Sequence, residues 1–164
     1  MRSAFFITCA LAVLLQGPVQ AADVIRRQAG DFPIASSVRV PAGSEIVFLS
    51  GTLADVVNAD APAGSVERFG DTETQVNSVL AKLNAELAAI GLSLADVVKM
   101  NVFMVGDPAK DGRMDFEGLM KAYTRHFGAE PPKTLPARTT VQVAALPLPG
   151  ALVEIEVIAV RPAG

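Results

Sequence analysis

Three charged residues near the end of the chain lie in runs that are otherwise rich in β-branched and apolar residues. They are Arg138, Glu154 and Glu156. The planar guanidinium of an arginine can hold a carboxylate through two parallel hydrogen bonds, which fixes the orientation of the bound anion. Arg138 is therefore the first candidate for binding an anionic substrate.

The two runs, residues 138–143 and 152–160, are predicted to be β-strands, because β-branched residues dominate and the side chains alternate between two faces. Prolines and a glycine between the runs indicate a loop. If that loop closes an antiparallel hairpin, same-face pairing sets Arg138 opposite Glu154 or Glu156. The simplest alternative to a chemical role is an exposed cross-strand ion pair, worth well under about 1 kcal/mol.

The second strand also predicts which face meets the core. One of its faces is uniformly apolar and is expected to contact helices; it carries Val153, Ile155 and Val157. The opposite face holds the two glutamates together with Leu152, Ile158 and Val160. Moving these apolar side chains out of water lowers the free energy. We therefore expect this second face to look toward neighbouring subunits.

The first 21 residues are predicted to be a signal peptide that is cleaved on export. A basic start precedes an apolar run over residues 4–15, and Val19-Gln20-Ala21 forms a small-residue cleavage pattern. A helix that spans a bilayer needs roughly 20 apolar residues, more than this run offers. Cleavage would remove Cys9, the single cysteine, so we expect a periplasmic or secreted protein without disulfides and without membrane attachment.

Composition argues against several classes of function. The formal net charge is −3, and the only Lys/Arg cluster noted is Arg26-Arg27, so a nucleic-acid partner is not expected. The chain has one histidine, His126, and loses its cysteine with the signal peptide, so a metal site is not expected. Ser50 has no histidine nearby in the sequence to make a hydrolase triad.

The rest of the chain predicts one domain. Residues 22–37 indicate an irregular N-terminal segment, and residues 38–164 a single domain. Further strands are expected over residues 38–40, 45–51 and 97–105, and helices over residues 72–90 and 116–127. Thr72 and Gln75 form a capping-box pattern at the start of the first helix. This order predicts an α+β sandwich, with a mixed sheet of about five to six strands and two helices on one face.

The motif around the charged residues resembles the C-terminal signature of the RidA family, also called the YjgF or UK114 family. The matching residues are Pro136-Ala137-Arg138, Val141, Val143, Leu146-Pro147 and Val153-Glu154-Ile155-Glu156. The resemblance implies a chorismate-mutase-like fold and a homotrimer with clefts between subunits. It also implies hydrolytic deamination of small 2-imino or 2-enamino acids to 2-oxo acids and ammonia, without a cofactor.

The resemblance also implies roles for single residues. Arg138 is expected to bind the carboxylate of the imine substrate, and Glu154 to position or activate the attacking water. Ser50 and Gly51 match the strand end beside the pocket, and Thr140 matches a substrate-binding position whose backbone N–H is kept whatever the side chain. Glu156 is expected to be structural.

Thr140 stands where a cysteine is usual, and two further positions depart more seriously from the family pattern. Ile34 stands where a tyrosine is usual, and Met120 stands where an asparagine is usual on the second helix. Both changes remove hydrogen-bonding groups. They leave three readings open: an altered substrate, a substrate with a larger apolar side chain, or no catalysis.

Two other functions remain as alternatives to deamination. A non-catalytic trimer could bind a small carboxylate or another protein through the same clefts, and Arg138 would serve it equally well. An endoribonuclease is the third reading, and it conflicts with the acidic balance and the predicted export.

Overall fold

The computed structural model describes residues 23–128 and 134–162. Within these ranges no helix has both the length and the apolar character needed to cross a membrane. The predicted signal peptide lies outside the described residues and stays a prediction.

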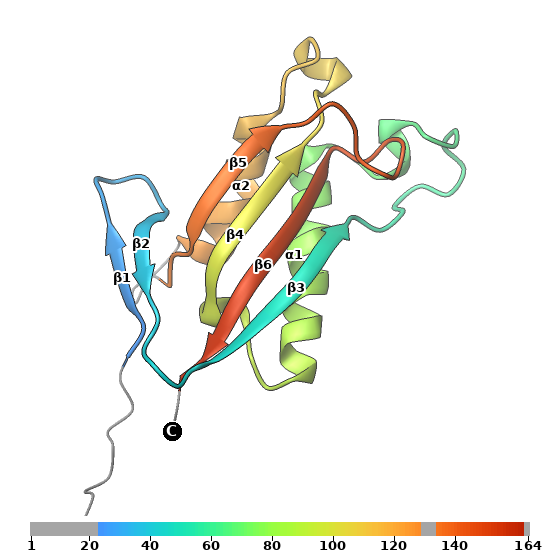
Figure 1. The fold of residues 1–164 in the computed structure, drawn as a ribbon. Coiled ribbons are helices and arrows are strands. Elements are labelled where there is room, and N and C mark those ends of the chain that lie inside the picture. The colour runs from blue at the N-terminus through green and yellow to red at the C-terminus, as the bar shows by residue number, and fades with distance from the viewer. Residues whose placement is uncertain (1–22, 129–133, 163–164) are drawn as a thin grey trace, which may run out of the picture.

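A six-stranded mixed sheet forms one layer and two α-helices cover one of its faces (Figure 1). The strands are β1 (Ile25–Gln28), β2 (Ala35–Arg39), β3 (Glu45–Leu53), β4 (Val97–Met104), β5 (Ala137–Gln142) and β6 (Val153–Arg161). Their order across the sheet is β1-β2-β5-β4-β6-β3. The prediction of an α+β sandwich with helices on one face is confirmed.

The expected irregular N-terminal segment is wrong, because residues 22–37 contain β1 and the start of β2. These two strands pair with each other as an antiparallel hairpin, and Gly30 supplies the positive φ of 68° that the connection requires. The hairpin joins the main sheet through one parallel residue pair, Ala35 with Ala137. Arg26 also ties it down, since its guanidinium donates to the carbonyl oxygens of Ala95 and Val97, each at 3.0 Å.

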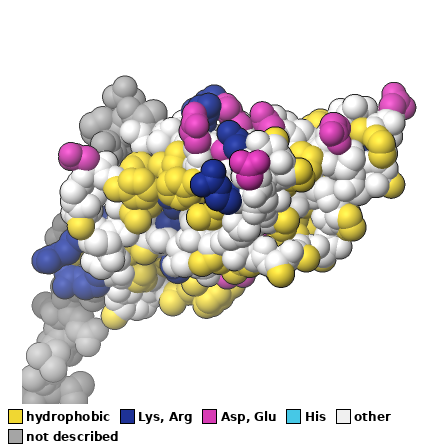
Figure 2. Space-filling model, turned by 90° about the horizontal axis from the view of Figure 1, so that it is seen from above, with side chains coloured by type: hydrophobic (Ala, Val, Ile, Leu, Met, Phe, Trp, Pro, Cys, Tyr) yellow, Lys and Arg dark blue, Asp and Glu magenta, His cyan; other side chains and the backbone are white. Residues whose placement is uncertain are grey.

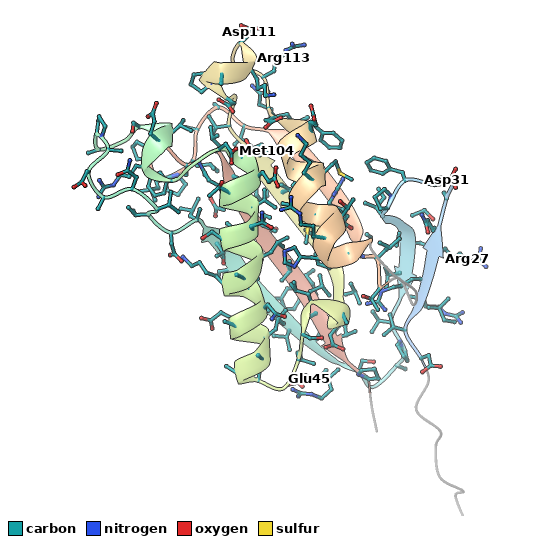
Figure 3. The ribbon with its side chains drawn as sticks, turned by 180° about the vertical axis from the view of Figure 1, so that it is seen from behind. Arg27, Asp31, Glu45, Met104, Asp111 and Arg113 are labelled. Atoms are coloured by element: carbon teal, nitrogen blue, oxygen red, sulfur yellow. The ribbon has the colours of Figure 1, made fainter. Side chains whose placement is uncertain are left out.

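The helices α1 (Thr72–Ala89) and α2 (Phe116–Phe127) bury their apolar stripes against the sheet, as the view from behind shows (Figure 3). The core between the layers includes Leu80 and Leu83 from α1 and Val102 and Ile155 from the sheet. Three short 3-10 turns lie at η1 (Val66–Arg68), η2 (Leu94–Asp96) and η3 (Pro108–Lys110).

The capping box predicted at Thr72 and Gln75 is wrong. Asp71 caps α1 instead, because its carboxylate accepts the backbone N–H of Thr74 at 2.9 Å. The buried Gln75 side chain donates to the carbonyl of Gly70 at 2.8 Å and accepts the N–H of Leu152 at 2.8 Å. Gln75 thereby fixes the loop that leads into β6.

The predicted hairpin between the two C-terminal strands is also wrong. β4 lies between them, parallel to β5 and antiparallel to β6. The crossover through α2 places β5 on one edge of β4, and residues 143–152 carry the chain across to the other edge. Arg138 is consequently in register with Met100 of β4, and it pairs with neither glutamate.

Candidate functional site

Arg138 points to the helix-covered side of the sheet, where side chains of α2 enclose it. Its Nη2 lies 3.2 Å from the sulfur of Met120, and its guanidinium carbon lies 4.2 Å from the centre of the Tyr123 ring. A thioether is a weak hydrogen-bond acceptor, so most of this contact is apolar and cation–π in character. Met120 is therefore more than the core filler that its residue type suggests.

Two further aromatic rings border the guanidinium. The guanidinium carbon is 5.7 Å from the ring centre of Phe32 and 5.9 Å from that of Phe116. These rings lie parallel, with centres 6.3 Å apart, and both are well exposed. Seen from above, hydrophobic side chains gather toward the hairpin end of the molecule, beside a group of acidic and basic side chains (Figure 2).

Burial controls the electrostatics of this group. Burial lowers the pKa of Arg138, although the nearby Tyr123 partly offsets the shift. Burial also raises the pKa of Tyr123 to about 12, against the effect of the Arg138 charge, so the phenol stays neutral. The result is a desolvated cation beside a neutral aromatic ring.

Several polar atoms around Arg138 have no partner. Among the described residues, Nη1 of Arg138, the Tyr123 hydroxyl and the Thr140 hydroxyl are buried and meet no hydrogen-bonding group. Thr140 lies two residues from Arg138 on the same face of β5. A buried donor costs free energy until it finds an acceptor, so this arrangement is suited to a carboxylate.

Glu154 lies on the opposite, open side of the sheet. Its neighbours in register are Leu53 of β3 and Phe103 of β4, whereas Val153 and Ile155 on either side of it point into the core. The carboxylate lies directly against Gly51, where an added methyl group would overlap Oε1 of Glu154. The β3–β6 register shifts between Leu49 and Thr52, so an irregularity inside β3 borders this carboxylate. The strand end expected at Ser50-Gly51 is wrong, because β3 continues to Leu53.

A hollow of about 390 Å³ lies on the open face around Glu156, two residues along β6 from Glu154. Ser50, Lys99, Asn101 and Glu156 contribute its polar groups. Glu156 accepts a hydrogen bond from the amide of Asn101 at 2.8 Å. This bond occupies one carboxylate oxygen and agrees with the structural role expected of Glu156.

The structure thus separates the predicted site residues into two groups. Arg138 and Thr140 face the helices, whereas Ser50, Gly51 and Glu154 belong to the open face and its edge. A β-sheet lies between the groups, so Arg138 and Glu154 of one chain do not meet.

Sequence reasoning missed the aromatic surroundings of Arg138. Phe116, Met120 and Tyr123 follow one another at spacings of four and three residues, which puts them on one helix face. This spacing around Met120 is the sequence signal that could have predicted an aromatic group beside Arg138. Nothing in the sequence links Phe32 to this group, because Phe32 lies in the β1–β2 connection and only the tertiary fold brings it next to α2.

The apolar residues expected to cover the open face need correction. Leu152 and Val160 are 2% and 1% exposed within the single chain, so they have no surface left for a partner. The exposed apolar residues of this face come from β3 instead: Ile46 is 53% and Phe48 75% exposed. Ile158, the third residue predicted for this face, is partly exposed and lines its hollow, so the open face keeps an apolar area to which Ile46, Phe48 and Ile158 contribute.

Within residues 23–128 and 134–162, no group of three or more His, Cys, Asp or Glu side chains could hold a metal ion. Burial and the neighbouring Arg125 lower the pKa of His126. This histidine belongs to the last turn of α2.

Comparisons with known proteins identify the family of the chain. Residues 32–161 match the family model described as Endoribonuclease L-PSP. Protein DfrA from Myxococcus xanthus is 38% identical over 78% of this chain and 85% of its own length. The 2-iminobutanoate/2-iminopropanoate deaminase of Salmonella typhimurium is 36% identical over 64% of this chain and 74% of its own length.

Among solved structures, the crystal structure of E. coli TdcF with bound serine is similar, with a TM-score of 0.53 and 33% identity. The match covers 74% of this chain and 84% of that one. The family model alone spans most of the chain. On these grounds the chain belongs to the RidA/YjgF/UK114 family, some of whose members are named as reactive intermediate or imine deaminases.

Proposed function

We propose that this protein hydrolyses small 2-imino or 2-enamino acids to 2-oxo acids and ammonia. The observation that carries the proposal is the buried guanidinium of Arg138, whose Nη1 has no acceptor among the described residues. A substrate carboxylate would take that donor and compete with the weak Met120 sulfur for Nη2. Both the named deaminase activity of the Salmonella relative and the serine bound to TdcF fit a carboxylate-bearing ligand.

In this proposal, Glu154 handles the water. Its carboxylate takes a proton from water as the oxygen adds to the C=N carbon, and it passes this proton to the nitrogen. The hydroxyl proton of the resulting carbinolamine then moves to the nitrogen through the same carboxylate, the C–N bond breaks, and ammonia leaves the C=O group of the 2-oxo acid. Glu154 needs a position beside water for this role, and the open face offers one.

Since Arg138 and Glu154 of one chain lie on opposite sides of the sheet, the proposed site forms between copies. A cyclic trimer brings a different patch of each subunit to every interface, so Arg138 of one copy can face Glu154 of the next. Exposed Ile46 and Phe48 give the open face an apolar area to bury in such a contact. Light scattering is expected to give the mass of a trimer.

A mixing experiment tests the shared site. Arg138→Ala and Glu154→Gln are each expected to be inactive alone. Co-expressed in equal amounts, they should regain about a quarter of wild-type activity, because that fraction of interfaces combines an intact arginine with an intact glutamate. Glu156→Gln, which changes a neighbouring carboxylate on the same face, is the matched control and should stay active.

If the mixture stays as inactive as its components, the two residues do not share a site between copies. If the wild type does not accelerate imine hydrolysis but still binds 2-oxo acids through Arg138, the chain is a binding module instead.

A further inference from the structure

We infer that Phe32, Phe116 and Met120 select ligands with a large apolar side chain, aromatic side chains above all. The inference rests on the function proposed above, in that Arg138 holds the carboxylate. It concerns the other end of the ligand, the substituent that distinguishes one 2-imino acid from another.

The contrast between two pairs of aromatic residues is the first step. Tyr123 and Phe127 stack with ring centres 4.9 Å apart and are 1% and 2% exposed, as expected for core side chains. Phe32 and Phe116 also lie parallel, but they are 44% and 37% exposed. The second pair therefore has accessible ring surface, and it lies within 6 Å of the cation that would hold the ligand.

The second step is the distribution of polar atoms. The unpartnered ones, on Arg138, Tyr123 and Thr140, are on side chains of β5 and the inner face of α2. They can serve the carboxylate and the nitrogen of a ligand. The rim formed by Phe32, Phe116 and Met120 offers apolar surface and no oxygen or nitrogen from its side chains.

A ligand side chain that passes this rim would leave water without gaining hydrogen bonds there. Polar substituents lose affinity under such conditions, and apolar ones gain it by covering exposed rings. Parallel phenyl rings also favour an aromatic partner, which can stack on them or meet their edges. A methyl group, in contrast, is too small to reach both rings.

Met120 leaves Nη2 of Arg138 available to a ligand carboxylate. Its sulfur is a weak acceptor for Nη2, so a carboxylate displaces it at small cost. An amide oxygen at the same place would hold Nη2 more firmly and compete with the ligand. Met120→Gln, which is nearly isosteric, is thus expected to weaken the binding of every 2-oxo acid about tenfold.

The test compares imines generated in place from D-alanine and D-phenylalanine by D-amino-acid oxidase. We expect kcat/KM of the full chain to be at least about tenfold higher for the phenylalanine-derived imine. Phe32→Ala and Phe116→Ala should each reduce the ratio of the two kcat/KM values about threefold or more, because a phenyl substituent loses more contact with the rings than a methyl group does. Ile90→Ala, which removes an equally exposed apolar side chain after α1, is the matched control and should keep the preference.

Calorimetric binding of pyruvate and phenylpyruvate separates the two hypotheses. If imines are hydrolysed but the small one is preferred, the inference is wrong and the proposed function stands. If no imine is hydrolysed but phenylpyruvate binds at least about tenfold more tightly, and Phe32→Ala removes the difference, the proposed function fails and the inference holds. If the wild type neither binds nor hydrolyses the larger ligand better, the inference is overturned.

Discussion

The two sides of the sheet hold their charges in opposite ways. Arg138 lies among aromatic rings and a thioether, with part of its hydrogen-bonding capacity unused. Glu154 lies on the open side against the backbone at Gly51, on the face whose hollow is lined by Glu156. A desolvated cation attracts an anion strongly, whereas a carboxylate that exchanges protons with water must stay near water. The sheet thus allows one chain to carry both environments, at the cost of needing a second copy to combine them.

The largest effect is expected from Arg138→Ala, which tests whether the helix-covered side binds the ligand carboxylate. It removes the guanidinium that would form a charge-assisted pair with the ligand. We expect kcat/KM to fall about 100- to 1,000-fold, or roughly 3–4 kcal/mol, mostly through weaker binding. Arg138→Lys should recover only part of the loss, because an ammonium cannot reproduce the planar fork. Steady-state kinetics and calorimetry check both variants; unchanged 2-oxo acid affinity in Arg138→Ala would contradict the assignment.

Glu154→Gln tests the other side. The amide keeps the shape but cannot accept the proton, so we expect kcat to fall about a hundredfold while 2-oxo acid binding is retained. The pattern to look for is a change in turnover without a change in the calorimetric dissociation constant. Equal losses of binding in Glu154→Gln and Arg138→Ala would mean that the two sides do not divide the work.

The exclusion of water from the surroundings of Arg138 can be measured through Tyr123, the single tyrosine of the chain. Because its folded pKa of about 12 exceeds the ordinary value near 10, the neutral phenol stabilises the fold below pH 10, and this contribution is lost as pH rises through 12. We expect up to about 2 kcal/mol of unfolding free energy to be lost over that range in the wild type.

Tyr123→Phe serves as the control, since it should show a smaller loss over the same range. Urea unfolding at each pH and the tyrosinate absorbance provide the two measurements. A tyrosine that titrates near pH 10 in the folded protein would show that water reaches the side chains around Arg138.

The smallest expected effect comes from Gly51→Ala. The new methyl group would overlap the Glu154 carboxylate and push it from its place, so we expect kcat to fall about tenfold with little change in binding. Gly128→Ala is a suitable control, because a methyl group there meets only ordinary contacts. Kinetics that do not distinguish the two variants would show that the position of Glu154 against Gly51 is unimportant.

The sequence predicted the layers of the fold well, since these depend on local periodicity. The alternating apolar face of β6 and the helical spacing in α1 and α2 were sufficient to predict two helices on one face of a mixed sheet. Strand neighbours were harder, because pairing depends on contacts between distant segments. β5 and β6 are adjacent in sequence, yet β4 separates them, and this single insertion removed the expected pairing of Arg138 with a glutamate.

The candidate site was predictable only in part for the same reason. Arg138 and Glu154 were identified from a motif, and their neighbours depend on which face each side chain takes. Gln75 shows a second limit: its sequence position suits a capping box, but a tertiary contact with Leu152 uses its side chain instead.

The two ends of the β1–β2 hairpin differ in a way that bears on how the protein can change during evolution. Ala35 and Val38 of β2 pack in or against the core, whereas Arg27 and Asp31 point away from the helices (Figure 3). Phe32 follows directly after Asp31. Insertions or substitutions at exposed positions near the tip of the hairpin can therefore alter one wall of the Arg138 site while Ala35 and Val38 keep their core contacts, so ligand range and stability can diversify independently among related chains.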